Sequence, residues 1–153
     1  MNLTIRPDDL SGEPTRALVA AHLAGMHENT PAESVHALDV DRLASDGVTM
    51  WSAWIDGEIA GIGACKDLGD QRAELKSMRV VEAHLGRGVG RAILRRIMAD
   101  ARERGIRSLW LETGSTADFV AARRLYASEG FVECPAFASY APDPLSTFMT
   151  REL

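Results

Sequence analysis

Three glycines alternate along the chain at Gly86, Gly88 and Gly90, directly before a stretch whose apolar residues have helical spacing. They follow residues 74–81, where apolar and charged side chains alternate as in a half-buried strand. A strand, a glycine-rich turn and a helix N-terminus in succession form an anion site, because unpaired backbone N–H groups converge there and the helix dipole is positive. Glycines also let a phosphate approach the backbone closely. The pattern therefore predicts a ligand that carries phosphate.

The spacing of the glycines separates the phosphate loops that could occupy such a turn. A Walker loop places Lys and then Ser or Thr after its last glycine, and no Lys follows these glycines. A dinucleotide loop has the pattern G-x-G-x-x-G after a wholly buried parallel strand, whereas this chain has G-x-G-x-G after a strand that carries charges. The Walker interpretation fails and the dinucleotide interpretation fits poorly. A nucleotide-binding module that uses the same glycine loop stays open as an alternative.

The remaining candidate is the pyrophosphate loop of acyl-CoA-dependent enzymes, and at this loop the chain resembles the GNAT superfamily of N-acetyltransferases. The family pattern Gln/Arg-x-x-Gly-x-Gly/Ala corresponds to residues 85–90. A second resemblance is the segment Ala-Arg-Arg-Leu-Tyr at residues 122–126, followed by Gly-Phe at residues 130–131, which matches the end of the family's last helix. The chain departs from the family at Leu85, where Gln or Arg is usual, and at Phe119, where many members have an Asn that contacts CoA.

The resemblance implies that acetyl-CoA is the co-substrate. Backbone amides of the central strand would hold the acyl carbonyl and the pantetheine arm, and the glycine loop would bind the pyrophosphate. The residues implied in cofactor binding are Met78, Arg79, Val80, Leu85, Gly86, Arg87, Gly88, Val89, Gly90, Arg91, Phe119 and Ala122.

Basic residues cluster beside the glycine loop, although the whole chain has a net charge of -5. Residues 86–107 contain seven Arg and two acidic residues, which gives a local charge of +5. Arg87, Arg91 and Arg95 are four residues apart and share one side of the predicted helix. We assign Arg87 and Arg91 to the phosphates of CoA, with a solvated helix face as the alternative. The acidic balance of the remaining chain argues against a nucleic-acid partner.

Acetyl transfer from a thioester to an amine needs a base for the amine and a proton for the departing thiolate. The resemblance implies direct attack within a ternary complex, without a covalent enzyme intermediate. Tyr126 matches the family position whose hydroxyl donates to the thiolate, with a buried structural tyrosine as the alternative. Glu74 and Glu112 are the candidates for the base, and each could instead be a structural or solvated carboxylate. His36 and Trp51 are candidates for the acceptor pocket.

Turn residues and helix caps predict the elements that position these side chains. Asp56-Gly57 predicts a tight hairpin turn. Gly61 and Gly63 make the second hairpin strand unusually small, which permits close approach of another element or a ligand. Ser115 is predicted to cap the last helix. The predicted strands span residues 2–6, 47–55, 58–66, 74–81, 106–113, 131–133 and 146–151, and the predicted helices span residues 14–26, 30–38, 89–104 and 115–129.

Length and composition predict one globular domain over residues 1–153, because 46% of the residues are hydrophobic and 25% are charged. The resemblance implies an α/β (α+β) GNAT fold, a mixed and mostly antiparallel sheet of about six or seven strands flanked by about four helices. No signal-like or membrane-spanning run is present in the sequence, so we expect a cytoplasmic protein without membrane contact. The spacing of the histidines and cysteines predicts no metal site.

We therefore expect an N-acetyltransferase that transfers the acetyl group of acetyl-CoA to a primary amine of a small molecule or a peptide. The alternative is a non-catalytic acyl-CoA-binding or regulatory domain of the same fold, which the departures at Leu85 and Phe119 favour and the presence of Tyr126 disfavours. Many members of the family form homodimers by pairing C-terminal strands, and residues 146–151 are the strand that could do so here.

Overall fold

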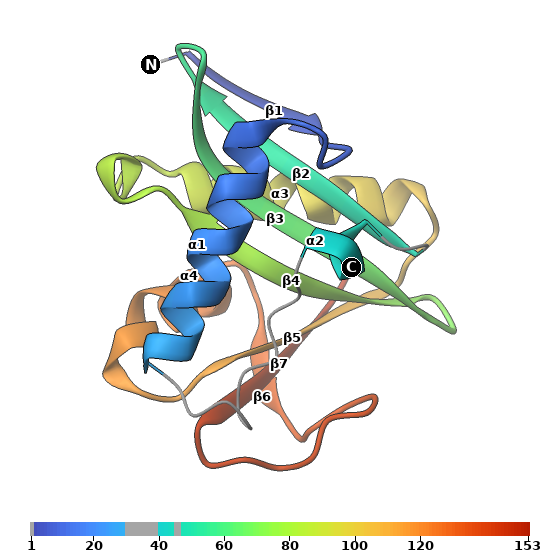
Figure 1. Cartoon of the computed structure of the whole chain (residues 1–153). Coiled ribbons are helices and arrows are strands. Elements are labelled where there is room, and N and C mark those ends of the chain that lie inside the picture. Colours follow the sequence, from blue (N-terminus) through green and yellow to red (C-terminus); the bar gives the residue numbers. More distant parts are fainter. Residues whose placement is uncertain (1, 30–39, 45–46) are drawn as a thin grey trace.

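A seven-stranded sheet runs through this computed structural model, which describes residues 2–29, 40–44 and 47–153. The strand order is β1-β2-β3-β4-β5-β7-β6 (Figure 1), and every neighbouring pair is antiparallel except β4 and β5, which are parallel. The predicted mixed, mostly antiparallel sheet is therefore confirmed. The strands are β1 Leu3–Pro7, β2 Val48–Ile55, β3 Glu58–Gly69, β4 Arg72–Val80, β5 Ser108–Gly114, β6 Val132–Cys134 and β7 Ser146–Glu152.

Helices cover both faces of the sheet. In Figure 1 α1 (Glu13–Asn29) crosses the front of the sheet, and α3 (Val89–Glu103) lies behind it against β2 and β3. α4 (Val120–Ser128) follows β5, and the single-turn α2 (Val40–Leu43) precedes β2. In the described part of the chain, three helices exceed two turns, slightly fewer than the four that we expected. The helix predicted over residues 30–38 lies outside the described residues.

The β2–β3 hairpin has the predicted two-residue turn. Asp56 and Gly57 have φ values of 49° and 85°, and two successive positive values are what a type I′ turn requires. Ile55 pairs with Glu58 directly across this turn. The turn sets the register of the first pairs, and a β-bulge between the Trp54–Ile59 and Ala53–Gly61 pairs then shifts it by one residue before the part of β3 that faces α3.

Small residues on β3 let α3 pack closely against the sheet, as predicted. A Cβ atom on Gly63 would lie 2.7 Å from Ile93 Cγ2, and one on Gly61 would lie 2.9 Å from Ile93 Cδ1. The close contact fixes the position of α3, and with it the position of the glycine loop at its N-terminus. The apolar face of α3 is buried as predicted, through Val89, Ile93, Leu94, Ile97, Met98 and Ala101.

The start of α4 differs from the prediction. Ser115 does not cap this helix, because its hydroxyl shares a hydrogen bond of 2.7 Å with Thr147 Oγ1. A short 3-10 helix, η3 (Ala117–Phe119), intervenes, and α4 begins at Val120. The Phe119 ring fills the space over Gly114, where a Cβ atom would lie 2.0 Å from the ring.

The C-terminal strand β7 is internal to the sheet. It pairs with β5 along its whole length and with β6 from Phe148 to Thr150. The edge strand at this end is therefore β6, and residues 146–151, which we considered for pairing between subunits, already have strand partners on both sides.

Replacing Gly63 with Ala should lower the free energy of unfolding by roughly 1–3 kcal/mol, because the added methyl group overpacks the contact with α3. Urea denaturation followed by circular dichroism measures this loss. Gly12→Ala is the matched control, since a Cβ atom on Gly12 would meet nothing within 4 Å. We expect that control to change stability by no more than about 0.5 kcal/mol. Equal stability of Gly63→Ala and the wild type would contradict the close packing of α3 on β3.

Candidate functional site

The two parallel strands at the centre of the sheet separate after four residue pairs. β4 and β5 pair from Arg72 and Ser108 to Leu75 and Leu111. Beyond this point β5 continues beside β7, and β4 continues beside β3. Residues 76–80 therefore have no strand partner on their β5 side among the described residues. Their backbone N–H and C=O groups on that side are available to a ligand.

A β-bulge in β4 accompanies this separation. Lys76 pairs with Ala64 and Arg79 with Ile62, so Ser77 and the residue after it together oppose a single residue of β3. Ser77 has a φ value of 54°, in the left-handed region that residues other than glycine rarely adopt. The bulge shifts the alternation of the strand by one residue.

One cleft follows the glycine loop from β4 to α4, and we call it the glycine-loop cleft. Gly86 and Gly88 have φ values of 76° and 82°, which favour glycine, and Gly88 is the N-cap of α3. N–H groups in the first turn of a helix have no intrahelical partner, so those of α3 are available to an anion. Among the predicted cofactor residues, the cleft is lined by Met78, Arg79, Val80, Leu85, Gly86, Gly88, Val89, Gly90, Arg91 and Ala122.

The arginines beside this cleft have different partners. Arg91 Nη1 lies 2.5 Å from Glu129 Oε1, and Arg95 Nε lies 3.0 Å from the same oxygen. The hydrogen bond from Arg91 lowers the pKa of Glu129, and the charge of Arg95 adds to this effect. Arg87 does not line the cleft, and within the described residues it has no ion pair; its Nη1 lies 3.4 Å from His84 Nδ1. The pairing with Glu129 ties the first turns of α3 to the end of α4.

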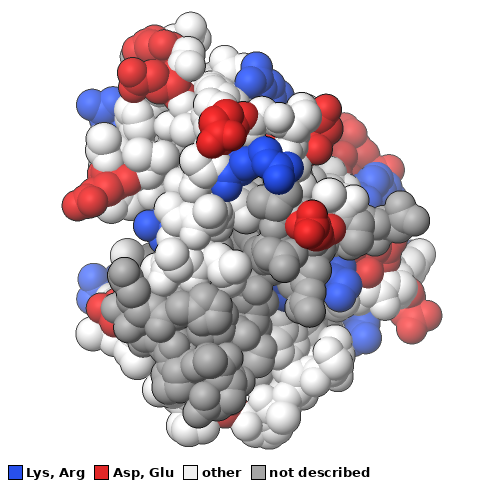
Figure 2. Space-filling model, viewed as in Figure 1, with Lys and Arg blue, Asp and Glu red and all other residues white. Residues whose placement is uncertain are grey.

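Basic and acidic side chains are interspersed on the face that carries α1, as Figure 2 shows for the described residues. That view contains no continuous basic surface over the described elements. The local excess of Arg that the sequence places at residues 86–107 belongs to the glycine loop and α3.

A second cleft lies where β4 and β5 separate, on the α1 face of the sheet, and we call it the carboxylate cleft. Its polar walls come from β4 and β5, and α1 contributes one of its sides. Phe119, predicted as a cofactor residue, lines this cleft instead of the glycine-loop cleft. The lining residues are His22, Met26, Glu74, Leu75, Lys76, Ser77, Met78, Glu112, Thr113, Phe119, Ala122, Tyr126 and Tyr140.

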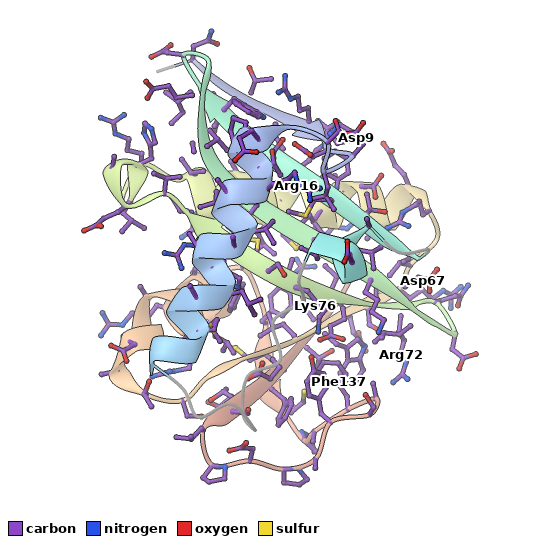
Figure 3. The ribbon with its side chains drawn as sticks, in the orientation of Figure 1. Asp9, Arg16, Asp67, Arg72, Lys76 and Phe137 are labelled. Atoms are coloured by element: carbon purple, nitrogen blue, oxygen red, sulfur yellow. The ribbon has the colours of Figure 1, made fainter. Side chains whose placement is uncertain are left out.

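Three of these polar groups form a hydrogen-bonded cluster in the carboxylate cleft, in which Glu74 is buried and Lys76 and Tyr140 are half-buried. Lys76 Nζ lies 3.0 Å from Glu74 Oε2 and donates to the Tyr140 hydroxyl at 2.9 Å. The Tyr140 hydroxyl in turn donates to Glu74 Oε2 at 2.5 Å. The Tyr140 ring packs on Phe137 and Phe148, with centroid distances of 5.1 and 5.5 Å. Figure 3 labels Lys76 on β4 and Phe137 on the loop before β7. The negative charge of Glu74 is therefore compensated within the protein.

The second carboxylate, Glu112, has a different environment. Burial raises its pKa to about 7. A hydrogen bond with the Ser146 side chain and the Lys76 ammonium oppose this rise, and the Glu74 carboxylate adds to it. His22, on the α1 side of the cleft, has its pKa lowered to about 4 by burial and by the nearby Arg79 guanidinium. At neutral pH His22 is thus uncharged, and Glu112 is the group in this cleft that changes its protonation state near pH 7.

Tyr126 connects the two clefts. Together with Met78 and Ala122 it lines both of them. Its ring is 6% exposed and packs on Phe131 with a centroid distance of 5.8 Å. Burial raises the pKa of the Tyr126 hydroxyl, and the Glu112 carboxylate raises it further. The hydroxyl therefore keeps its proton throughout the physiological pH range.

The predicted acceptor residue Trp51 does not join this site. Trp51 lies in the main core behind the sheet, where its ring faces the Arg96 guanidinium at 5.0 Å. His36 lies outside the described residues. The structure adds Lys76 and Ser77, whose positions on the walls of the cleft the sequence analysis did not recognise. The sequence does contain a sign of the bulge. The apolar residues of this strand lie at odd positions up to Leu75 and at even positions after it, as a bulge requires.

The described residues contain no group of three or more His, Cys, Asp or Glu side chains that could hold a metal ion. Among the described helices, none has the length and hydropathy of a membrane span.

Comparison with known proteins identifies the class to which this fold and these clefts belong. The model of the Acetyltransferase (GNAT) family matches residues 16–131. The chain is 46% identical to the uncharacterized N-acetyltransferase YsnE of Bacillus subtilis over 97% of this chain and 99% of YsnE. It is 47% identical to the uncharacterized N-acetyltransferase YedL of Escherichia coli over 98% of this chain and 94% of YedL.

A solved structure supports the same class. A protein from Klebsiella pneumoniae that is named as an acyl-CoA N-acyltransferase superposes with a TM-score of 0.81 at 30% identity, and the match covers 99% of this chain and 97% of that one. The chain belongs to the GNAT family of acetyltransferases. The family resemblance and the enzyme class inferred from the sequence are thereby confirmed.

Replacing Glu112 with Gln should stabilise the protein at high pH relative to the wild type. The pKa of Glu112 is raised from 4.5 to about 7 in the folded protein. The protonated carboxyl therefore adds to the free energy of unfolding below pH 4.5, and this contribution is lost as the pH rises to about 7. A glutamine side chain does not ionise, so the variant does not lose stability in this way. We expect the difference in unfolding free energy between Glu112→Gln and the wild type to grow by about 3 kcal/mol between pH 4.5 and pH 8. Urea denaturation across this range measures it, and a difference independent of pH would show that Glu112 has an ordinary pKa.

Proposed function

We propose that this protein transfers the acetyl group of acetyl-CoA to the primary amine of a small molecule or a peptide, by direct attack within a ternary complex. The observation that carries the proposal is that the glycine-loop cleft and the carboxylate cleft meet at Tyr126. A thioester bound in the first cleft and an amine bound in the second would come together at this residue. Proximity of this kind supplies a large part of the rate of acyl transfer.

The glycine-loop cleft suits acetyl-CoA for two reasons. Its inner end is the first turn of α3, where free N–H groups and the left-handed Gly86 and Gly88 suit a pyrophosphate. Its wall includes the β4 residues Met78, Arg79 and Val80, whose backbone N–H and C=O groups do not pair with β5. These groups can pair with the amides of a pantetheine arm as a further strand would. Arg91 lines this cleft but is paired with Glu129, whereas Arg87 has no ion pair among the described residues but lies outside the cleft lining, so both stay candidates for an additional phosphate contact.

Tyr126 is suited to protonate the departing thiolate. Its raised pKa keeps the phenol protonated, so the O–H group is available to donate to the sulfur as negative charge develops there. When the amine nitrogen attacks the thioester carbonyl, a C–N bond forms and the C–S bond breaks. The electron pair of the C–S bond leaves on sulfur, which takes the Tyr126 proton, and the proton released by the attacking nitrogen returns to the Tyr126 oxygen.

Of the two candidate bases, the geometry favours Glu112. The Oε2 atom of Glu74 already accepts hydrogen bonds from Lys76 and Tyr140, and its charge is neutralised by the same lysine. Glu112 lines the same cleft, and its pKa of about 7 lets it take a proton from an ammonium group at neutral pH. We therefore assign proton acceptance to Glu112 and a structural role to Glu74.

Titration with acetyl-CoA in a calorimeter is the first test. We expect a dissociation constant in roughly the micromolar range and little heat from ATP. Gly88→Ala should weaken acetyl-CoA binding about tenfold, because a methyl group would crowd the phosphate at the helix N-terminus. Gly105→Ala is the matched control, since Gly105 has nearly the same φ of 81°, has no atom within 4 Å of an added Cβ, and lies beyond the other end of α3. Equal weakening in both variants, or preference for ATP, would contradict the proposed cofactor.

Replacing Tyr126 with Phe should lower kcat by about 100-fold while leaving the affinity for acetyl-CoA nearly unchanged. The substitution removes one hydroxyl and keeps the ring that packs on Phe131. Steady-state kinetics and calorimetry measure the two effects. Unchanged turnover would remove Tyr126 from the mechanism, whereas a large loss of acetyl-CoA affinity would show that its role is in binding.

A further inference from the structure

Ser77 presents a buried hydroxyl that has no partner in the protein. The residue is 8% exposed, and its Oγ atom makes no hydrogen bond. It lines the carboxylate cleft but not the glycine-loop cleft. Its chain neighbour Met78 lines both clefts, so Ser77 stands on the acceptor side of their junction.

The bulge in β4 does not explain why this residue is a serine. A bulge with a left-handed φ is most easily formed by glycine, and a serine there adds backbone strain. Burying a hydroxyl without a hydrogen bond adds a second unfavourable contribution. Glycine at this position would avoid both. Such groups persist where they are used, so a ligand is the natural partner for this hydroxyl.

Trp51 and Thr116 also have buried polar atoms without partners in the described structure, and neither residue lines either cleft. The Ser146 hydroxyl, by contrast, lies beside Glu112 and lowers the pKa of that carboxyl. Within this set the unpaired hydroxyl of Ser77 is the one that faces the space where β4 and β5 separate.

We propose that Ser77 Oγ accepts a hydrogen bond from the primary amine of the acceptor and so places the nitrogen between Glu112 and Tyr126. This inference rests on the function proposed above and adds a specific binding residue to it. The cleft also contains the apolar side chains of Met26 and Phe119. Its ligand is thus a primary amine attached to an apolar body, whose nitrogen is held by Ser77 while Glu112 takes its proton.

Benzylamine is a suitable probe, because its amine is its only hydrogen-bonding group. We would titrate benzylamine into the wild type, Ser77→Ala and Ser77→Gly, each saturated with CoA. Both variants should bind benzylamine roughly tenfold more weakly than the wild type, since each removes the hydroxyl. The affinity for acetyl-CoA and the melting temperature should not fall in either variant. With acetyl-CoA as donor, KM for benzylamine should rise roughly tenfold and kcat should change little.

Thr116→Val is the matched control, because it removes another buried unpaired hydroxyl that lies outside the cleft. It should leave the benzylamine affinity unchanged. Unchanged affinity in Ser77→Ala would overturn the inference, and so would a loss of kcat at constant KM, which would assign the hydroxyl to the acyl carbonyl. Failure of the wild type to bind benzylamine at millimolar concentration would also overturn it. If the proposed function is wrong, acetyl-CoA itself will not bind before any amine is added. That outcome is distinct from a failure to bind benzylamine.

Discussion

The separation of β4 from β5 is the constraint on which the rest of this structure depends. Parallel strands normally satisfy each other's backbone groups along their whole length, yet this pair stops after Leu75 and Leu111. The bulge at Ser77 turns β4 toward β3 and exposes the edge of its last residues. A sheet that opens in this way creates two connected spaces, one bounded by the glycine loop and one bounded by carboxylates. Under the proposed function, the acyl transfer would take place where the two spaces meet.

Close packing behind the sheet keeps the opening in a fixed shape. Glycines on β3 allow α3 to pack closely against the strands. Gly90 on α3 allows a similar approach of α4, because a Cβ atom on Gly90 would lie 3.3 Å from a methyl carbon of Leu125. The Arg91–Glu129 ion pair joins the same two helices near the loop. The distance between the glycine loop and Tyr126 is therefore set by helix packing rather than by loops. Rigid elements of this kind hold reacting groups more accurately than loops do.

Two carboxylates on neighbouring strands illustrate how surroundings divide chemical roles. Glu74 and Glu112 face the same cleft, and both are largely removed from water. Glu74 is paired with an ammonium group and a phenol, whereas Glu112 receives less compensation, so burial raises its pKa to about 7. The loop before β7 makes this difference, since it delivers Tyr140 to Glu74 from 66 residues away in the chain. A change in that loop would alter the proton chemistry of the site without touching either carboxylate.

The sequence by itself determined the local elements and the glycine loop. The hairpin turn at Asp56-Gly57, the buried face of α3 and the small residues of β3 follow from conformational preferences and periodicity, which act over a few residues. The place of Tyr126 beside the glycine loop followed from a family resemblance. Only the tertiary structure distinguished the surroundings of Glu74 from those of Glu112, placed Trp51 outside the two clefts, and revealed the unpaired hydroxyl of Ser77. These properties depend on burial and on partners that are distant in sequence, and no local pattern of residue types contains that information.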